Sequence, residues 1–118
     1  MKQAARLITV FLLLSGSSAA IKAQSDMVSL EHGRGDRLFQ EKCGMCHRAG
    51  GMGTGILARR LSPEQALLEN RADLSSALIE TAVRNGFGIM FPMSRAEVSD
   101  QQLATITNYL TDADGNSP

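Results

Sequence analysis

The chain has 118 residues, which leaves room for one small domain at most. The charges of its twelve basic and twelve acidic residues cancel. A protein that binds nucleic acid would need an excess of positive charge, so nucleic acid is not the expected partner. The chain has no Trp and one Tyr, so its core is modest and is a candidate for support by a staple or a prosthetic group.

The first 23 residues have the pattern of a secretory signal peptide. Lys2 and Arg6 supply positive charge, an apolar run of eight residues follows at 7–14, and small and polar residues then lead to Ala20 or Ala23. The apolar run is too short for a membrane span, which needs about 20 residues. We therefore expect export to the periplasm, cleavage near Ala20 or Ala23, and no stable membrane insertion afterwards. Cleavage after Ala23 would leave nine basic against twelve acidic residues, a net charge of −3.

The mature chain is expected to begin with a flexible lead-in, followed by one helix and a loop. Residues 24–32 are mostly polar and form the lead-in, and residues 33–42 form a helix whose apolar stripe includes Leu38 and Phe39. Residues 48–55 are rich in glycine, which adopts regular structure only at an entropic cost, so this segment is predicted to be a loop.

Capping patterns predict where the middle helices start. Residues 62–65, Ser-Pro-Glu-Gln, combine an N-cap serine with a first-turn proline and predict a short helix. Asp73 is expected to cap a longer helix that ends at Gly86. The apolar residues of this longer helix recur at helical spacing: Leu74, Leu78, Ala82 and Val83.

The last helix is predicted from a second capping box at residues 99–102. The apolar residues that follow share one face of this helix: Leu103, Ile106 and Leu110, with Tyr109 beside them. Residues 87–98 have no clean period and contain Pro92, so they are expected to be a loop, and residues 112–118 a polar tail. Because no repeat and no pair of strands is apparent, the predicted fold class is all-α.

Both cysteines of the chain lie in one motif, Cys43-Gly44-Met45-Cys46-His47. Haem carries two vinyl groups, and two thiols three positions apart at the end of a helix can each form a thioether with one of them. The histidine after the second thiol is then directed at the iron. The C-x-x-C-H pattern therefore predicts covalent attachment of one haem c through Cys43 and Cys46, with His47 as an axial ligand.

Three other interpretations of the motif are weaker. A disulfide between Cys43 and Cys46 would close a very small loop and stabilise little. A thioredoxin-like redox motif requires a βαβ setting, which the predicted helices do not provide. A zinc site needs four ligands, and only His32 and carboxylates remain beyond the motif. His32 itself is expected to be a solvated residue before the first helix.

The second axial position of the iron is expected to be filled by a methionine from the loop at 87–98. Met45 lies inside the motif, and Met52 follows the haem histidine too closely to reach the opposite face of the ring. Met90 and Met93 lie between the last two helices, far enough along the chain to do so. A thioether is a soft, neutral donor that favours reduced iron and raises the reduction potential.

The order of these features resembles the class I cytochromes c over nearly the whole mature chain. In that family a glycine and an aromatic residue before the first cysteine pack against an aromatic residue of the last helix. Gly35, Phe39 and Tyr109 stand in those places here. The resemblance implies a small cytochrome c fold over residues 33–111, with three to five helices wrapped around one covalently bound haem.

Residues 83–90 most resemble the small cytochrome subunits of p-cresol methylhydroxylase-type flavocytochromes and alcohol dehydrogenases. In those subunits the methionine ligand follows an Asn-Gly-Phe-x-x pattern, which implies Met90 as the ligand here. Their ligand is followed directly by proline, whereas Phe91 stands between Met90 and Pro92 in this chain. Met93 therefore remains the alternative ligand.

The same resemblance implies two supporting roles. Such cytochromes usually have Gly-Pro after the haem histidine, and a backbone carbonyl there orients the imidazole. Gly53 and Thr54 occupy that place here, and the Thr54 carbonyl is expected to do the same. Arg59 lies where some relatives pair an arginine with a haem propionate, and Arg60 is an equal candidate.

These patterns together predict a monohaem electron carrier rather than an enzyme, with no catalytic residues. It would accept electrons from a dehydrogenase and pass them towards a respiratory chain through a downstream cytochrome or oxidase. The alternative is a five-coordinate haem enzyme or gas-binding sensor, which would need a vacant axial site. The two methionines of the loop, and the lack of an obvious distal His or Arg pair, argue against that alternative.

Overall fold

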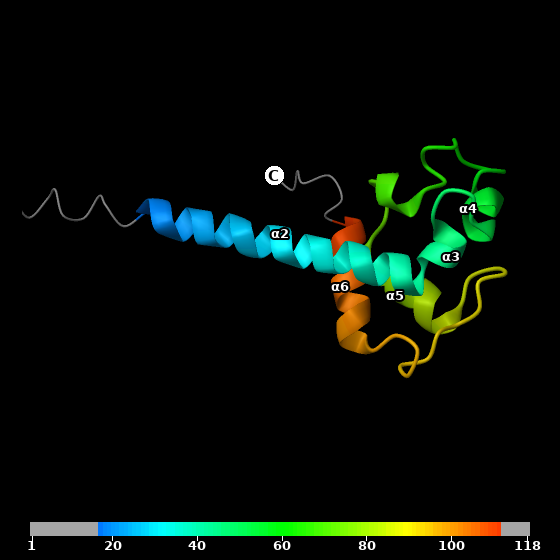
Figure 1. Cartoon of the computed structure of the whole chain (residues 1–118). Helices are drawn as coiled ribbons and strands as arrows, with labels where there is room; N and C mark the ends of the chain where they lie inside the picture. Colours follow the sequence, from blue (N-terminus) through cyan, green and yellow to red (C-terminus); the bar gives the residue numbers. More distant parts are fainter. Residues whose placement is uncertain (1–16, 112–118) are drawn as a thin grey trace, which may run out of the picture. The chain divides into compact units, whose positions relative to one another are not determined.

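The computed structural model describes residues 17–111, so the polar tail and most of the expected signal peptide lie outside the described residues. This part of the chain is helical (Figure 1). Its elements are α2 (Ser17–Lys42), α3 (Gly44–His47), α4 (Met52–Leu57), the 3-10 helix η1 (Leu68–Asn70), α5 (Ser76–Asn85) and α6 (Asp100–Thr111). Residues 17–111 contain no strand, only an isolated antiparallel bridge between Phe87 and Met90, and this confirms the all-α class.

Helix α2 begins earlier than the helix expected from Gly33. It starts at Ser17 and runs through the segment expected to be a flexible lead-in. The residues from Ser17 to His32 include no proline or glycine and several strong helix formers, so intrinsic propensity rather than burial accounts for this extension.

The chain divides into two compact units, one ending at Leu30 and one starting at Glu31. Every residue proposed for the site lies in the second unit, which is therefore the one that matters for function. None of the helices described between residues 17 and 111 is long and apolar enough to cross a membrane.

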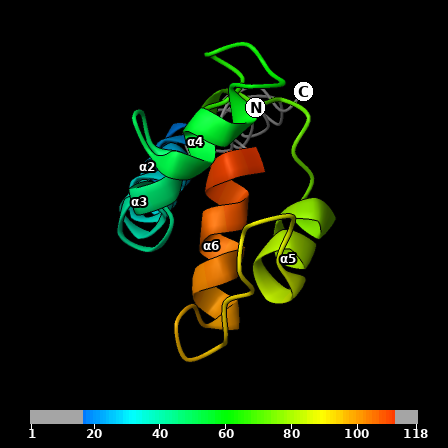
Figure 2. The same cartoon turned by 90° about the vertical axis from the view of Figure 1, so that its right-hand side faces the viewer.

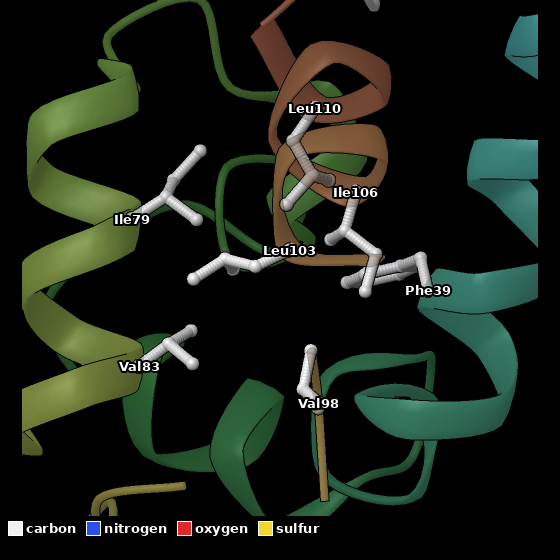
Figure 3. Packing of buried hydrophobic residues seen from close by; sticks show 7 residues of the cluster. All are labelled: Phe39, Ile79, Val83, Val98, Leu103, Ile106 and Leu110. Carbon is white, nitrogen blue, oxygen red and sulfur yellow. The ribbon is translucent and has the colours of Figure 1, made fainter. Parts of the chain in front are cut away.

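The core of the second unit lies between α2, α5 and α6. Its buried side chains point toward one another from these three helices and from the segment before α6 (Figure 3): Phe39, Ile79, Val83, Val98, Leu103, Ile106 and Leu110. Phe39 and Val98 are the largest of the completely buried side chains. The apolar face predicted for the last helix is therefore confirmed.

Helices α2 and α6 are in close contact at a glycine, and Figure 2 shows the two helices next to each other. A Cβ atom on Gly35 would collide with the Tyr109 side chain and would lie 3.0 Å from the Thr105 carbonyl oxygen. The rings of Phe39 and Tyr109 pack beside this crossing, with their centroids 5.9 Å apart. The contact predicted between Gly35, Phe39 and Tyr109 is therefore confirmed, and only a residue without a side chain fits at its centre.

Helix α5 starts later than predicted and uses a different cap. Ser75 is the N-cap, and its Oγ accepts a hydrogen bond from the Leu78 N–H at 3.3 Å. Asp73, the expected cap, is instead paired with Arg71, with 2.7 Å between Nη2 and Oδ2. The later start places Ile79 in the core and leaves Leu78, expected on the buried face, 41% exposed.

The two predicted capping boxes give opposite results. Ser99 and Gln102 form the complete box, with the Ser99 N–H 2.9 Å from Gln102 Oε1 and the Gln102 N–H 3.2 Å from Ser99 Oγ, and α6 follows. Ser62 accepts from the Gln65 N–H at 3.3 Å, but only a turn and η1 follow. A cap satisfies only the first amides of a helix. The apolar residues 66–68, of which Ala66 is buried, are followed by mostly polar residues at 69–73, so the buried face does not continue into a longer helix.

Candidate functional site

The C-x-x-C-H motif occupies one short helical turn directly after α2. The Cys43 N–H donates to the Phe39 carbonyl at 2.8 Å, and the N–H groups of Cys46 and His47 both donate to the Cys43 carbonyl, at 3.1 and 3.0 Å. Residues three apart on a helical turn share a face, so the local backbone brings the two cysteines to the same side of α3. Both are free thiols and half-buried.

The Cys43 thiol is poorly suited to thiolate chemistry. Burial, reinforced by the nearby Cys46, raises the pKa of Cys43 to about 11. The free thiol is therefore protonated at neutral pH, whereas a redox-active cysteine has a lowered pKa and is present as the thiolate. Among the described residues there is also no group of three or more His, Cys, Asp or Glu side chains placed to hold a metal ion.

His47 ends α3 in a half-buried position. Burial lowers the pKa of its imidazole, so the ring is neutral at pH 7, the form in which histidine binds a metal. Its Nδ1 atom is buried and has no hydrogen-bond partner within the described part of the chain. Two free thiols and a neutral imidazole on one turn fit covalent attachment of haem with a nitrogen ligand to its iron.

The segment after the motif contains a helix, α4, where a loop was expected. Two of the glycines are required here by close approach: a Cβ on Gly51 would collide with the Cys46 carbonyl, and one on Gly53 would lie 3.2 Å from His47 Cε1. The buried Thr54 hydroxyl donates to the Arg48 carbonyl at 2.9 Å. Packing against α3 therefore offsets the entropic cost of a glycine-rich helix.

The role expected for Thr54 is not the one found. Its carbonyl accepts from the Ala58 N–H at 2.9 Å, inside α4, and does not bond to His47. Its hydroxyl instead reaches the backbone at the end of the motif, with Cys46 O at 3.5 Å in addition to Arg48 O. Thr54 thus supports the attachment segment, residues 43–47, through its side chain, because its carbonyl already accepts a hydrogen bond within α4.

The methionines divide into two groups by burial. Met45 on α3 and Met52 on α4 are 85% and 65% exposed. Met90 and Met93 are partly buried and pack against the same core that Cys43 contacts. The fold therefore brings the two candidate ligands of the loop, and not the methionines near the motif, to the core beside the attachment segment.

The loop that carries these two methionines is tightly turned. Gly86 ends α5 with φ of 78°, as predicted for the end of this helix. Phe87 and Met90 then exchange backbone hydrogen bonds of 3.0 and 2.9 Å across Gly88, whose φ of 60° also favours glycine. The Met93 N–H returns to α5 and donates to the Val83 carbonyl at 2.7 Å.

Three further basic residues were considered from the sequence. Arg59 and Arg60 follow α4 with exposed side chains, which make no hydrogen bond or ion pair to the part of the chain that the structure describes. His32 lies within α2 rather than before the first helix, but it is exposed, as expected. Its ring packs against Tyr109 in a tilted arrangement, with centroids 4.9 Å apart. His32 thus belongs to the contact between α2 and α6, away from the motif.

Arg84 is the residue of this region that the sequence analysis did not single out. Its side chain is 17% exposed and donates to the carbonyl oxygens of Met93 and Val98 and to the Asp100 carboxylate. A single arginine near the end of a predicted helix carries no local signal, because its partners lie nine to sixteen residues further along the chain.

Comparisons with known proteins agree with this geometry. Residues 31–110 match the sequence model of a family described as cytochrome C oxidase, cbb3-type, subunit III. The chain is also 33% identical over 93 residues to the cytochrome c subunit of 4-cresol dehydrogenase [hydroxylating] from Pseudomonas putida, covering 79% of this chain and 69% of that subunit. No solved structure matches the chain significantly. The family match spans both the C-x-x-C-H motif and the loop at residues 87–98, which carries Met90 and Met93.

Proposed function

Because the chain belongs to the cytochrome c family whose model matches residues 31–110, we propose that it is an exported monohaem electron carrier. The family match and the dehydrogenase cytochrome subunit among its relatives support an electron-transfer cytochrome. In the proposed role, the protein accepts electrons from a dehydrogenase in the periplasm and passes them towards a respiratory chain.

The observation that carries this proposal is the donor set of residues 43–47, the motif formed by the N-cap Cys43 and α3. Cys43 and Cys46 are free thiols three positions apart on one turn, and the neutral imidazole of His47 follows them directly. In the proposed holoprotein the two thiols would hold one haem c through thioethers, and the His47 imidazole would supply a nitrogen ligand to its iron. The haem supplies one-electron chemistry at its iron.

The rest of the chain acts by positioning and by excluding water. The buried side chains of α2, α5 and α6 provide an apolar wall next to Cys43. A site lined in this way disfavours the charged state of the cofactor and so favours reduction. If protein side chains supplied both of the remaining ligands of the iron, no position would be left for a substrate, and this would distinguish an electron carrier from a haem enzyme.

Met90 is the proposed second ligand, with Met93 as the alternative. Both thioether side chains lie partly buried against the core, so burial alone does not separate them. The backbone does distinguish them, because Met90 belongs to the turn closed with Phe87, whereas Met93 is tied to Val83. The Asn-Gly-Phe-x-x pattern before Met90 supports the first assignment.

Arg59 is the proposed partner of a haem propionate, and Arg60 is its alternative. Both guanidinium groups are exposed at the end of α4, the helix packed against the attachment segment. An exposed arginine keeps its full donor set available for a carboxylate, although such pairs contribute little to stability in water.

The optical spectrum of the purified holoprotein tests the proposed function. Ligation by methionine predicts the weak near-infrared sulfur-to-iron band in the ferric protein and no spectral change when carbon monoxide is added to the reduced protein. A high-spin spectrum that shifts with carbon monoxide would instead assign a vacant axial site and a gas-binding or enzymatic role.

The same band distinguishes the two methionines. Met90→Ala is expected to abolish it, and Met93→Ala to leave it in place. Met45→Ala serves as a control for the loss of a methionine outside the loop, because Met45 is 85% exposed. Loss of the band in Met93→Ala alone would transfer the ligand role to Met93.

A further inference from the structure

The guanidinium of Arg84 lies at the centre of the methionine loop, residues 87–98. It donates from Nη1 to the Met93 carbonyl at 3.1 Å, and from Nη2 to the Val98 carbonyl at 2.9 Å and to Asp100 Oδ1 at 2.9 Å. These acceptors lie in the middle of the loop, at its end and on the first residue of α6. One side chain on α5 therefore ties together the segments that the loop connects.

The backbone next to Arg84 reinforces this closure. The Val83 carbonyl accepts the Met93 N–H at 2.7 Å, while Arg84 donates to the Met93 carbonyl. Two consecutive residues of α5 thus bind both polar groups of the Met93 backbone. Val83 is itself buried in the core, which anchors this contact to the rigid part of the fold.

We propose that Arg84 is a positioning residue for the axial methionine: it holds the loop closed on α5 so that a thioether stays on the iron. The inference rests on the proposed methionine ligation. A thioether is a weak, neutral ligand, and its occupancy depends on how often the loop opens. The contacts of Arg84 are lost on opening, so they shift that equilibrium towards the closed, ligated state.

The chemistry of arginine matches this task better than that of lysine. A guanidinium presents five N–H donors in a planar fork and can serve several acceptors in different directions at once. A lysine ammonium keeps the charge, but it is a compact group that cannot span the three acceptors from the same position. Hydrogen bonds from a charged donor are also stronger than neutral ones, and the bonds of Arg84 to the two carbonyls are partly buried.

Arg95 provides a matched control within the same cluster. It pairs with the other oxygen of the same carboxylate, 2.8 Å from Nε to Asp100 Oδ2, but its side chain is 72% exposed. It makes no hydrogen bond to a loop carbonyl within the described residues. Arg95→Gln therefore removes the same charge and an ion pair with the same carboxylate as Arg84→Gln, but it leaves the contacts of Arg84 to the Met93 and Val98 carbonyls in place.

Imidazole titration of the ferric holoprotein tests the proposal, because added imidazole competes with the thioether for the iron. Arg84→Gln is expected to raise the apparent imidazole affinity by about tenfold or more, since the variant loses charge-assisted contacts to the closed loop. Arg95→Gln is expected to stay within about twofold of the wild type, as is usual for an exposed ion pair. Arg84→Lys is expected to behave like Arg84→Gln.

Several outcomes would overturn the inference. Wild-type imidazole affinity in Arg84→Gln, even with a lowered melting temperature, would assign a purely structural role. Full rescue by Arg84→Lys would show that charge alone suffices, which contradicts the proposed role of the planar guanidinium.

A second variant is needed if Arg84→Gln yields no holoprotein. Asp100→Ala removes one acceptor of the same guanidinium and should raise the apparent imidazole affinity several-fold. An unchanged imidazole affinity would contradict the proposal. Failure of the proposed function is separate, because it appears in the wild type as a missing sulfur-to-iron band.

Discussion

The attachment segment, residues 43–47, and the methionine loop, residues 87–98, are held in place in different ways. The first is one helical turn whose groups are consecutive in sequence and whose backbone bonds to itself and to Phe39. The second has almost no regular structure and depends on Val83, Arg84 and Asp100, which lie outside it. The chain thus encodes one half of the proposed site locally and the other half through contacts distant in sequence.

The largest expected effect is a difference in covalently bound haem between variants of the attachment segment and variants of the methionine loop. A variant with Cys43→Ser and Cys46→Ser should lose all covalently bound haem, because no thiol remains for a thioether. A variant with Met90→Ala and Met93→Ala should retain it, since the loop supplies no covalent bond. Haem staining after denaturing electrophoresis measures this difference. Loss of the stain in the methionine variant would show that attachment itself depends on the loop.

The next largest effect concerns the helix crossing beside the attachment segment. Gly35→Leu should prevent stable folding, because even a Cβ there collides with Tyr109. Gly35→Ala should lower the free energy of unfolding by about 1–3 kcal/mol, the usual cost of overpacking. Chemical denaturation followed by circular dichroism measures the change.

Gly33 is the matched control for this crossing, because it lies on the same helix and a Cβ there meets nothing within 4 Å. Gly33→Ala should raise the free energy of unfolding by about 0.5–1 kcal/mol, the difference in helix propensity. Equal responses at Gly33 and Gly35 would mean that the crossing contributes nothing and that propensity alone matters.

Sequence patterns predicted the parts of the molecule that are local. The motif with Cys43 and His47, the capping box at Ser99 and the end of α5 at Gly86 each depend on a few consecutive residues, and the structure has the box and the helix end as expected. The contact of Gly35 with Tyr109 was predictable only through the resemblance to class I cytochromes c, because 74 residues separate the two.

The features that the sequence did not reveal depend on tertiary contacts. Aspartate is a residue type that often caps helices, but the Asp73 carboxylate forms an ion pair with Arg71. Ser75 caps α5 instead. The glycine-rich segment after the motif is helical over Met52–Leu57 and packs on α3, with close approaches to the motif at Gly51 and Gly53. No local sequence pattern marks Arg84, because the carbonyl oxygens that accept its hydrogen bonds belong to a loop without regular structure.

A smaller effect compares the two capping serines. Ser99→Ala removes the cap of α6 at the exit of the methionine loop and should lower the free energy of unfolding by about 1 kcal/mol. Ser62→Ala removes a similar hydrogen bond that leads into no α-helix, and it should change stability by less than about 0.5 kcal/mol. Thermal melting of the two variants tests the ranking, and a larger loss for Ser62→Ala would reverse it.

The smallest expected effect is a sensitivity of the loop to acid. Hydrogen bonding to Arg95, and less strongly to Arg84, holds the pKa of Asp100 below its usual value, and bonds from Ser94 do the same for the pKa of Glu97. A carboxyl group whose pKa is depressed in the folded state contributes its full stability above its unfolded pKa, near 4, and loses it as the pH falls through the folded pKa. The loop contacts should therefore weaken below about pH 4, and only modestly, because both carboxylates are exposed.

The intensity of the sulfur-to-iron band between about pH 6 and pH 3 reports this weakening at the loop itself. Asp100→Asn removes the titrating group, so its band should be weaker at pH 6 and should change less on acidification than that of the wild type. Asp73→Asn is the control, because the pKa of Asp73 is also lowered, by its hydrogen bonds with Arg71, but outside the loop. This control should keep the wild-type band profile while its global unfolding becomes less sensitive to acid. An equally flattened band profile in Asp73→Asn would mean that acid loosens the whole domain together, and the loop would then have no separate equilibrium for Arg84 to control.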